Sequence, residues 1–142
     1  MSVIVNIADA VVAELNASGL LPGVTAQRHY RPTFDLEEMK DLHVTVVPRG
    51  VEMSGASRLS CQSDVQIDIG VQKKPPEVNQ AELDSLMALV EQIADYLRGR
   101  RLAGAPEASW VKTENNPIFA AEHLEQLRQF TSVLTVTYRV LR

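Results

Sequence analysis

Residues 79–101, NQAELDSLMALVEQIADYLRGRR, carry the clearest helical pattern in the chain. Asn79 is the expected N-cap, and Glu82 stands where a capping box places its acidic residue. Apolar residues recur at the period of an α-helix and form one continuous stripe: Leu83, Leu86, Met87, Val90, Ile93, Ala94 and Leu97. A stripe of this length has to be buried, and the face of a β-sheet is its natural cover.

The strands of that sheet are predicted on both sides of the helix. Three segments alternate between apolar and polar residues, as half-buried strands do: Leu42–Val47, Asp64–Gln72 and Phe130–Leu141. Pro48 is expected to end the first of them. Trp110–Glu114 predicts a further short strand, and an edge strand near Ala26–Tyr30 fits the sequence.

The N-terminal segment predicts another helix, from about Asn6 to Ala17, with Asn6 as its N-cap. The element order is then α-β-β-α-β-β. Hairpin-length links favour a mostly antiparallel sheet of about four strands with both helices packed on one face. The predicted fold class is therefore α+β, with long loops, in a single domain over residues 1–142.

Long loops fill the rest of the chain. Arg49–Ser63 has little apolar pattern and predicts a long, mobile hairpin loop. Apolar residues are scattered through the loops: Leu36, Met53, Trp110, Ile118, Phe119 and Leu124. Such anchors fit subunit contacts, while surface loops folded over their own core remain the simpler alternative.

The bulk properties exclude several classes of protein. A net charge of −4 argues against a dedicated nucleic-acid binder. The single cysteine, Cys61, excludes an intrachain disulfide and favours a reducing compartment. The N-terminus lacks a secretory pattern, and no run reaches the roughly 18 apolar residues of a membrane-spanning helix. We expect a protein that stays in the cytoplasm, or in something assembled there.

No catalytic motif is recognisable. The sequence contains no glycine-rich phosphate loop, no paired-cysteine metal site and no nucleophile elbow. His29, His43 and His123 lie in three different segments, without the spacing of metal ligands. The arginines at 98, 100 and 101 fit charge at a helix C-terminus better than a phosphate site. We therefore expect no enzymatic activity, no cofactor and no metal.

Three segments resemble the small tail-terminator and neck proteins of long-tailed bacteriophages and prophages. They are Leu42–Gly50, Asp64–Lys74 and Gln129–Tyr138. The length of the chain, its loop-rich middle and its ending on a strand are also similar to that family. The resemblance is one of pattern and local sequence, and it spans nearly the whole chain.

The resemblance implies a structural protein that forms a hexameric ring, caps the growing tail tube and joins it to the head connector. The implied partners are further copies of the chain, the tail tube protein and a head–tail connector. DNA would pass through the ring without sequence-specific binding, and a hexamer would carry about −24 formal charges, six times −4. The implied location is the tail or neck of the virion, after assembly in the host cytoplasm.

The family has no catalytic residues to carry over, and its loops and strand edges make the ring contacts. The candidate subunit or partner contacts lie in the Arg49–Ser63 loop and the Asn115–Gln129 segment: Arg49, Met53, Arg58, Ile118, Phe119, His123 and Leu124. One alternative is another neck protein, either a head–tail adaptor or a tail-completion factor. A small ligand-binding α+β domain is a second alternative.

Overall fold

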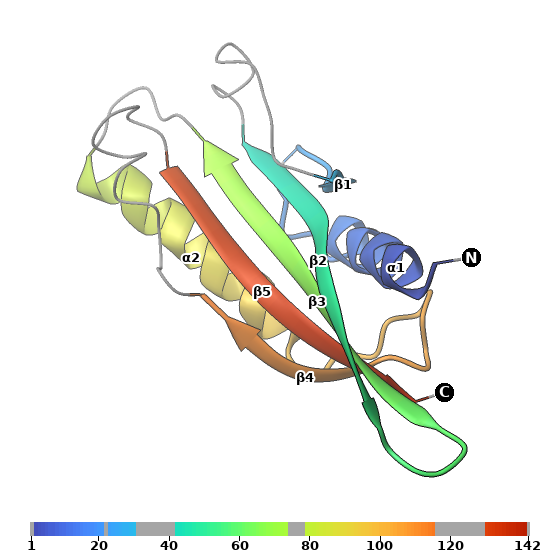
Figure 1. Ribbon diagram of the computed structural model, residues 1–142. Coiled ribbons are helices and arrows are strands. Elements are labelled where there is room, and N and C mark those ends of the chain that lie inside the picture. Colours follow the sequence, from blue (N-terminus) through green and yellow to red (C-terminus); the bar gives the residue numbers. More distant parts are fainter. Residues whose placement is uncertain (1, 22, 31–41, 74–78, 116–129, 142) are drawn as a thin grey trace.

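The computed structural model describes residues 2–21, 23–30, 42–73, 79–115 and 130–141. They form two helices and a five-stranded sheet (Figure 1), in the order α1 (Val3–Ala17), β1 (Gln27–Arg28), β2 (His43–Gly55), β3 (Cys61–Lys73), α2 (Gln80–Leu97), β4 (Ser109–Glu114) and β5 (Phe130–Leu141). The strand order is β1-β2-β3-β5-β4, with β1 parallel to β2 and the other pairs antiparallel. The α+β prediction is confirmed, with the edge strand β1 making the fifth strand.

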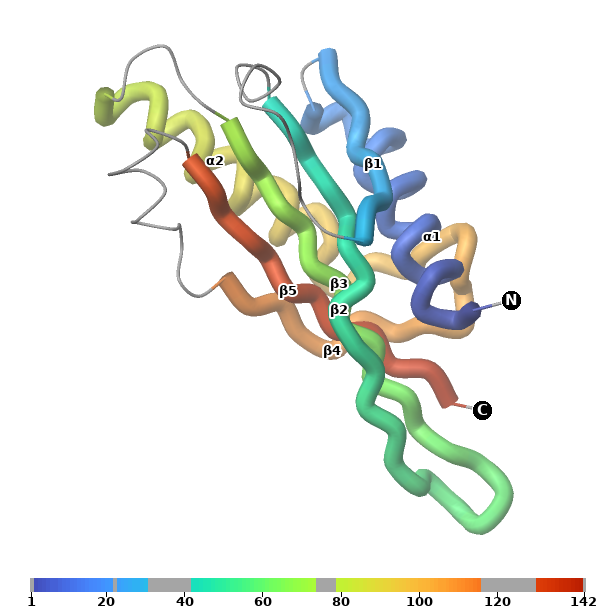
Figure 2. The backbone as a smooth tube through the Cα atoms, turned by 45° about the horizontal axis from the view of Figure 1, so that its top comes forward, coloured from blue at the N-terminus to red at the C-terminus, as the bar shows by residue number. Residues whose placement is uncertain are grey.

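Both helices cover the same face of the sheet, as Figures 1 and 2 show from two directions. One continuous core lies between the layers. Its fully buried side chains come from α1 (Ile7 and Val11), from α2 (Ile93 and Leu97) and from β3 (Val65, Ile67, Ile69 and Val71). The opposite face of the sheet carries the polar residues of each strand and has no helix over it among the described residues. We call it the open face.

The ends of the helices follow from their caps. The side chain of Asn79 accepts a hydrogen bond from the Glu82 backbone N–H at 2.8 Å, so the predicted cap of α2 is confirmed. The predicted start of α1 is wrong by about one turn. Ser2 caps that helix, and Asn6 lies inside it. Because the helix starts earlier, Val3 and Ile4 lie within it and pack against the core. A helix capped at Asn6 would have left both residues outside it.

The hairpin of β2 and β3 differs most from the prediction. Pro48 does not end β2, because the register shifts between Pro48 and Gly50, and such a bulge tolerates the missing N–H of proline. The predicted loop Arg49–Ser63 is instead strand up to Gly55 and again from Cys61. The alternation is weak here because most of β2 beyond Pro48 is exposed on both faces.

The connection from α2 to β4 is held by a carboxylate from α1. Glu14 accepts hydrogen bonds from Arg100 Nε at 2.8 Å and from the Ala103 backbone N–H at 3.0 Å. Both hydrogen bonds lower the pKa of the Glu14 carboxyl, and the one from Ala103 has the larger effect. The guanidinium of Arg100 also lies 4.1 Å from the centre of the Tyr96 ring. Arg100 therefore bridges two helices rather than only balancing a helix dipole.

Candidate functional site

The most prominent surface feature is a two-stranded arm, residues 50–62, at the far end of the β2–β3 hairpin. It projects beyond the two helices and the rest of the sheet in both backbone views (Figures 1 and 2). Backbone N–H groups of Ala56 and Ser57 donate to the Ser60 carbonyl at 3.2 Å, and these bonds close the turn. The arm is thus an ordered hairpin with few side chains of its own chain around it.

Apolar side chains on the arm are left in water. Val51 is 46% exposed, Met53 is 61% exposed and Leu59 at the turn is 96% exposed. Val51 pairs with Val65, whose side chain lies in the core, so Val51 and Met53 point to the helix side of the sheet. Single exposed apolar residues are common, but three on one short hairpin indicate an interaction surface.

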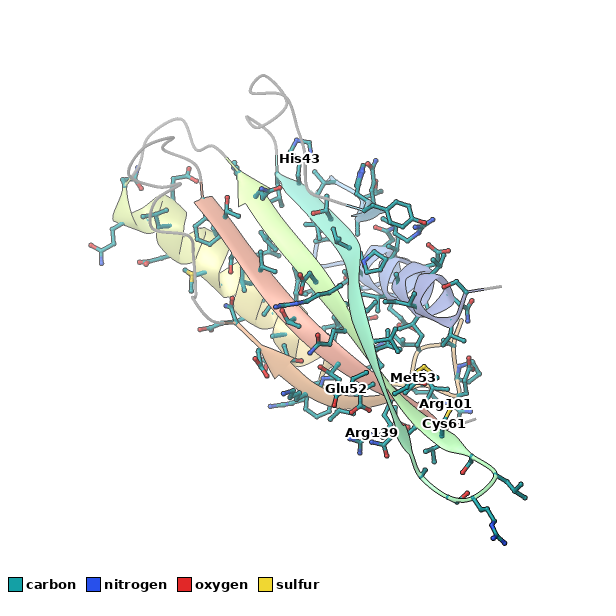
Figure 3. All side chains as sticks on the ribbon, viewed as in Figure 1. His43, Glu52, Met53, Cys61, Arg101 and Arg139 are labelled. Carbon is teal, nitrogen blue, oxygen red and sulfur yellow. The ribbon has the colours of Figure 1, made fainter. Side chains whose placement is uncertain are left out.

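The base of the arm is fixed by charged groups on the open face. Arg139 donates to both carboxylate oxygens of Asp64, at 2.9 and 3.3 Å, and these hydrogen bonds lower the pKa of Asp64. Glu52, Asp64 and Arg139 form one row across β2, β3 and β5, and Figure 3 shows Glu52 and Arg139 where the arm begins. An ion pair joins Arg49 to Asp68, with 3.5 Å between a guanidinium nitrogen of Arg49 and Oδ1 of Asp68. These contacts join the strands of the sheet at the base of the arm.

The edge of the sheet opposite β1 offers a groove beside β4. The groove, between α2 and β4, has a volume of about 430 Å³. Its apolar lining residues are Val90, Ala94, Trp110 and Leu134, and its charged ones are Glu91, Asp95, Arg98 and Lys112. The indole N–H of Trp110 donates to the Thr113 hydroxyl at 2.9 Å, which fixes the ring along the groove. This arrangement suits the docking of an apolar side chain rather than a reaction.

The structure places only some of the sequence-predicted contacts. Arg49 and Met53 lie on β2, and Arg58 lies exposed in the turn of the arm. Ile118, Phe119, His123 and Leu124 lie outside the described residues. Sequence reasoning missed Val51 and the groove beside β4. The alternation of Val51, Glu52 and Met53 was the available signal for the first, whereas the groove joins segments that no local pattern connects.

A second groove, of about 810 Å³, lies between α2 and the segment around Leu20 and Val24. Lys73 and Glu82 are its titratable lining residues, and they do not form a recognisable catalytic set. Within the described ranges, no group of three or more His, Cys, Asp or Glu side chains could hold a metal ion. No helix in the described part of the chain is long and apolar enough to cross a membrane.

Comparison with known proteins gives a structural match. No family model and no curated protein matches the sequence. Among solved structures 26 chains match. One is the sheath/tube terminator of PVC, an extracellular contractile injection system, seen by cryo-electron microscopy in its extended state. The TM-score is 0.54 at 21% sequence identity, over 100% of this chain and 57% of that chain. The two proteins therefore share a fold, and this chain spans little more than half the length of its neighbour.

Proposed function

We propose that this chain is a structural tail terminator, which forms a ring on the end of a tail tube. The observation that carries the proposal is the fold, which matches a sheath/tube terminator over the full length of this chain. The projecting arm, with its exposed Val51 and Met53, supports it, because a ring subunit needs surfaces that only a neighbour covers.

The ring is proposed to be a hexamer in the tail of a long-tailed phage or prophage, as the sequence resemblance implies. Its partners are the tail tube protein on one side and a head–tail connector on the other, with DNA passing through the centre. Because the matched structure is a terminator of sheath and tube, a contractile sheath joins the candidate partners. Arg49, Met53 and Arg58 are the proposed contact residues that the structure describes.

The role is proposed to be structural rather than enzymatic. Charged side chains on the open face are engaged with one another: Arg49 with Asp68, Asp64 with Arg139, and Lys112 with Glu114 at 2.7 Å. Mutual pairing of this kind stiffens a surface and leaves few charges to act on a substrate. It suits a subunit that has to hold one shape within a ring.

Electron microscopy of particles assembled without this chain tests the proposal. Loss of a terminator leaves overlong tails, because nothing stops tube polymerisation, and supplying the chain should restore a uniform length. Loss of a head–tail adaptor leaves tails of normal length beside detached heads. Normal-length tails in the absence of the chain would contradict the terminator proposal and favour the adaptor.

A further inference from the structure

The sheet ends in two edges that the described residues leave largely unpaired. On one side, β1 pairs with β2 only at Thr45 and Val46, so the outer edge of β2 is open from Val47 to Gly55. On the other side, the outer edge of β4, Ser109–Glu114, has no partner strand among the described residues. Unpaired strand edges are ready templates for pairing with another chain.

We propose that the arm of one copy pairs with β4 of the next copy and lays Val51 and Met53 over the groove beside β4. This inference rests on the proposed ring and specifies its subunit contact. Since β2 is antiparallel to β3, β3 to β5 and β5 to β4, the strands β2 and β4 run in opposite directions. Copies related by rotation, with their helices on one side, therefore bring these edges together as an antiparallel pair.

Charges on the two edges match in this antiparallel alignment. On the open face, β2 presents Arg49 and then Glu52, which is level with Asp64. Strand β4 presents Lys112 and then Glu114 on the same face, level with Thr137 and Thr135. When the strands run in opposite directions with Glu52 beside Lys112, Glu114 comes opposite Gly50. The neighbouring Arg49 also lies opposite Glu114, because Arg49 is the extra residue at the register shift of β2. Each cross-strand neighbour then carries the opposite charge, which favours this register.

Apolar groups match on the other face. Trp110 pairs with Tyr138, a core residue, so the Trp110 side chain lies on the helix side of β4, as Met53 does on β2. With Glu52 beside Lys112, plain counting would set Met53 beside Val111. The register of β4 shifts between Trp110 and Lys112, so Val111 is the extra residue there and Met53 comes beside Trp110 on the helix side. Methionine fills irregular apolar gaps and makes favourable contacts with aromatic rings. The groove supplies the rest of the cover for the exposed side chain.

An arm that occupies the groove has to come from another copy. Within one chain, β3 and β5 separate β2 from β4, a distance of about 14 Å for three strand spacings. The arm also projects away from its own body, as Figure 1 shows. Arm and groove are different patches, so the contact is head-to-tail, and such a contact repeats around a ring when the rotation closes.

Disulfide trapping between two variants tests the alignment. With Cys61→Ser as background, Ser54→Cys is made in one variant and Ser109→Cys in another, since the alignment sets these two exposed serines opposite each other. A disulfide requires Cα atoms within about 7 Å, which the alignment satisfies between copies but the fold does not within one chain. Mixing the variants should give covalent dimers at least about tenfold faster than mixing Ser54→Cys with Ser85→Cys, an exposed serine on α2.

A matched pair of substitutions tests the apolar contact. Met53→Asp should weaken self-association about tenfold or more, measured by light scattering over a concentration series, because it puts a carboxylate into the groove. Leu141→Asp is the control, because Leu141 is 64% exposed, close to the 61% of Met53, and lies outside the proposed contact. Both side chains are exposed to water in the single chain, so neither substitution should lower its free energy of unfolding appreciably.

The outcomes separate the inference from the proposed function. Rapid trapping of the Ser54–Ser109 pair, with assembly lost only in Met53→Asp, supports the contact. A second outcome would overturn the contact and leave the terminator function intact. In it, rings form and terminate tails, but Ser54→Cys forms disulfides no faster with Ser109→Cys than with Ser85→Cys. A chain that stays monomeric at every concentration and does not bind tail tubes overturns both.

Discussion

Replacing Tyr138 with phenylalanine should stabilise the protein. The Tyr138 side chain on β5 is fully buried, and its hydroxyl has no hydrogen-bond partner in the part of the chain that the structure describes. A hydroxyl buried without a partner costs about 1–3 kcal/mol. Tyr138→Phe removes that cost but leaves a small void, so we expect a net gain of about 1 kcal/mol in the free energy of unfolding, or about 3 °C in Tm.

The difference between the two proteins should grow at alkaline pH. Burial, and then the negative charge of Glu14, raise the pKa of Tyr138 well above its ordinary value of 10.0. A raised pKa means that the folded state holds the proton after the unfolded state has lost it. The free energy of unfolding of the native protein is therefore unaffected by this proton below pH 10 and falls progressively above it. The phenylalanine variant has no proton to lose and does not show this fall.

Urea unfolding followed by circular dichroism, at pH 7 and at about pH 10.5, measures both effects. Tyr30→Phe is the control, because Tyr30 is exposed on the surface, and its stability should stay within about 0.5 kcal/mol of the native protein. A Tyr138→Phe variant that is less stable than the native protein at pH 7 would refute the reasoning, since it would show that the hydroxyl is bonded.

Three further changes test the fold. Asn79→Ala should cost about 1 kcal/mol in urea unfolding through the lost cap of α2. Glu14→Gln should lower stability at neutral pH. The lowered pKa of Glu14 gives the native protein stability that is present above pH 4.5 and lost as the pH falls through the folded value, so a pH series of thermal melts should show this loss in the native protein and not in the variant. Gly70→Ala should cost about 1–3 kcal/mol by the same melts, since its Cβ would lie 3.0 Å from Thr45 Oγ1.

The elements that could be predicted are those whose signals are local. Asn79 caps α2 through a residue three positions away, and the stripe of α2 repeats within one helix. Phe130–Leu141 was predicted in full, because every second residue of β5, from Phe130 to Val140, is buried on the helix side of the sheet. The pairing of β5 between β3 and β4 was not predictable, because it is set by packing between distant segments.

Glu14 shows why the remaining contacts escaped prediction. Its helical spacing puts Glu14 on the apolar face of α1, beside Ile7 and Val11, whereas its charge would predict a solvated residue. Its partners, Arg100 and Ala103, are 86 and 89 residues away and meet it only once both helices are on the sheet. The groove beside β4 escaped prediction for the same reason, since its lining residues Val90 and Trp110 come from different elements.

The arm was mispredicted for a related reason, and that reason bears on its role. Prediction from periodicity assumes that the chain covers its own apolar residues, and Val51 and Met53 break that assumption. In the proposed ring they are covered by a neighbour, and both open edges of every copy are paired. Each copy then makes two contacts, so removing one subunit breaks two interfaces, and a closed ring is favoured over an open chain. A ring without free strand edges has no lateral site at which a further copy could add, so its size is fixed by the closure.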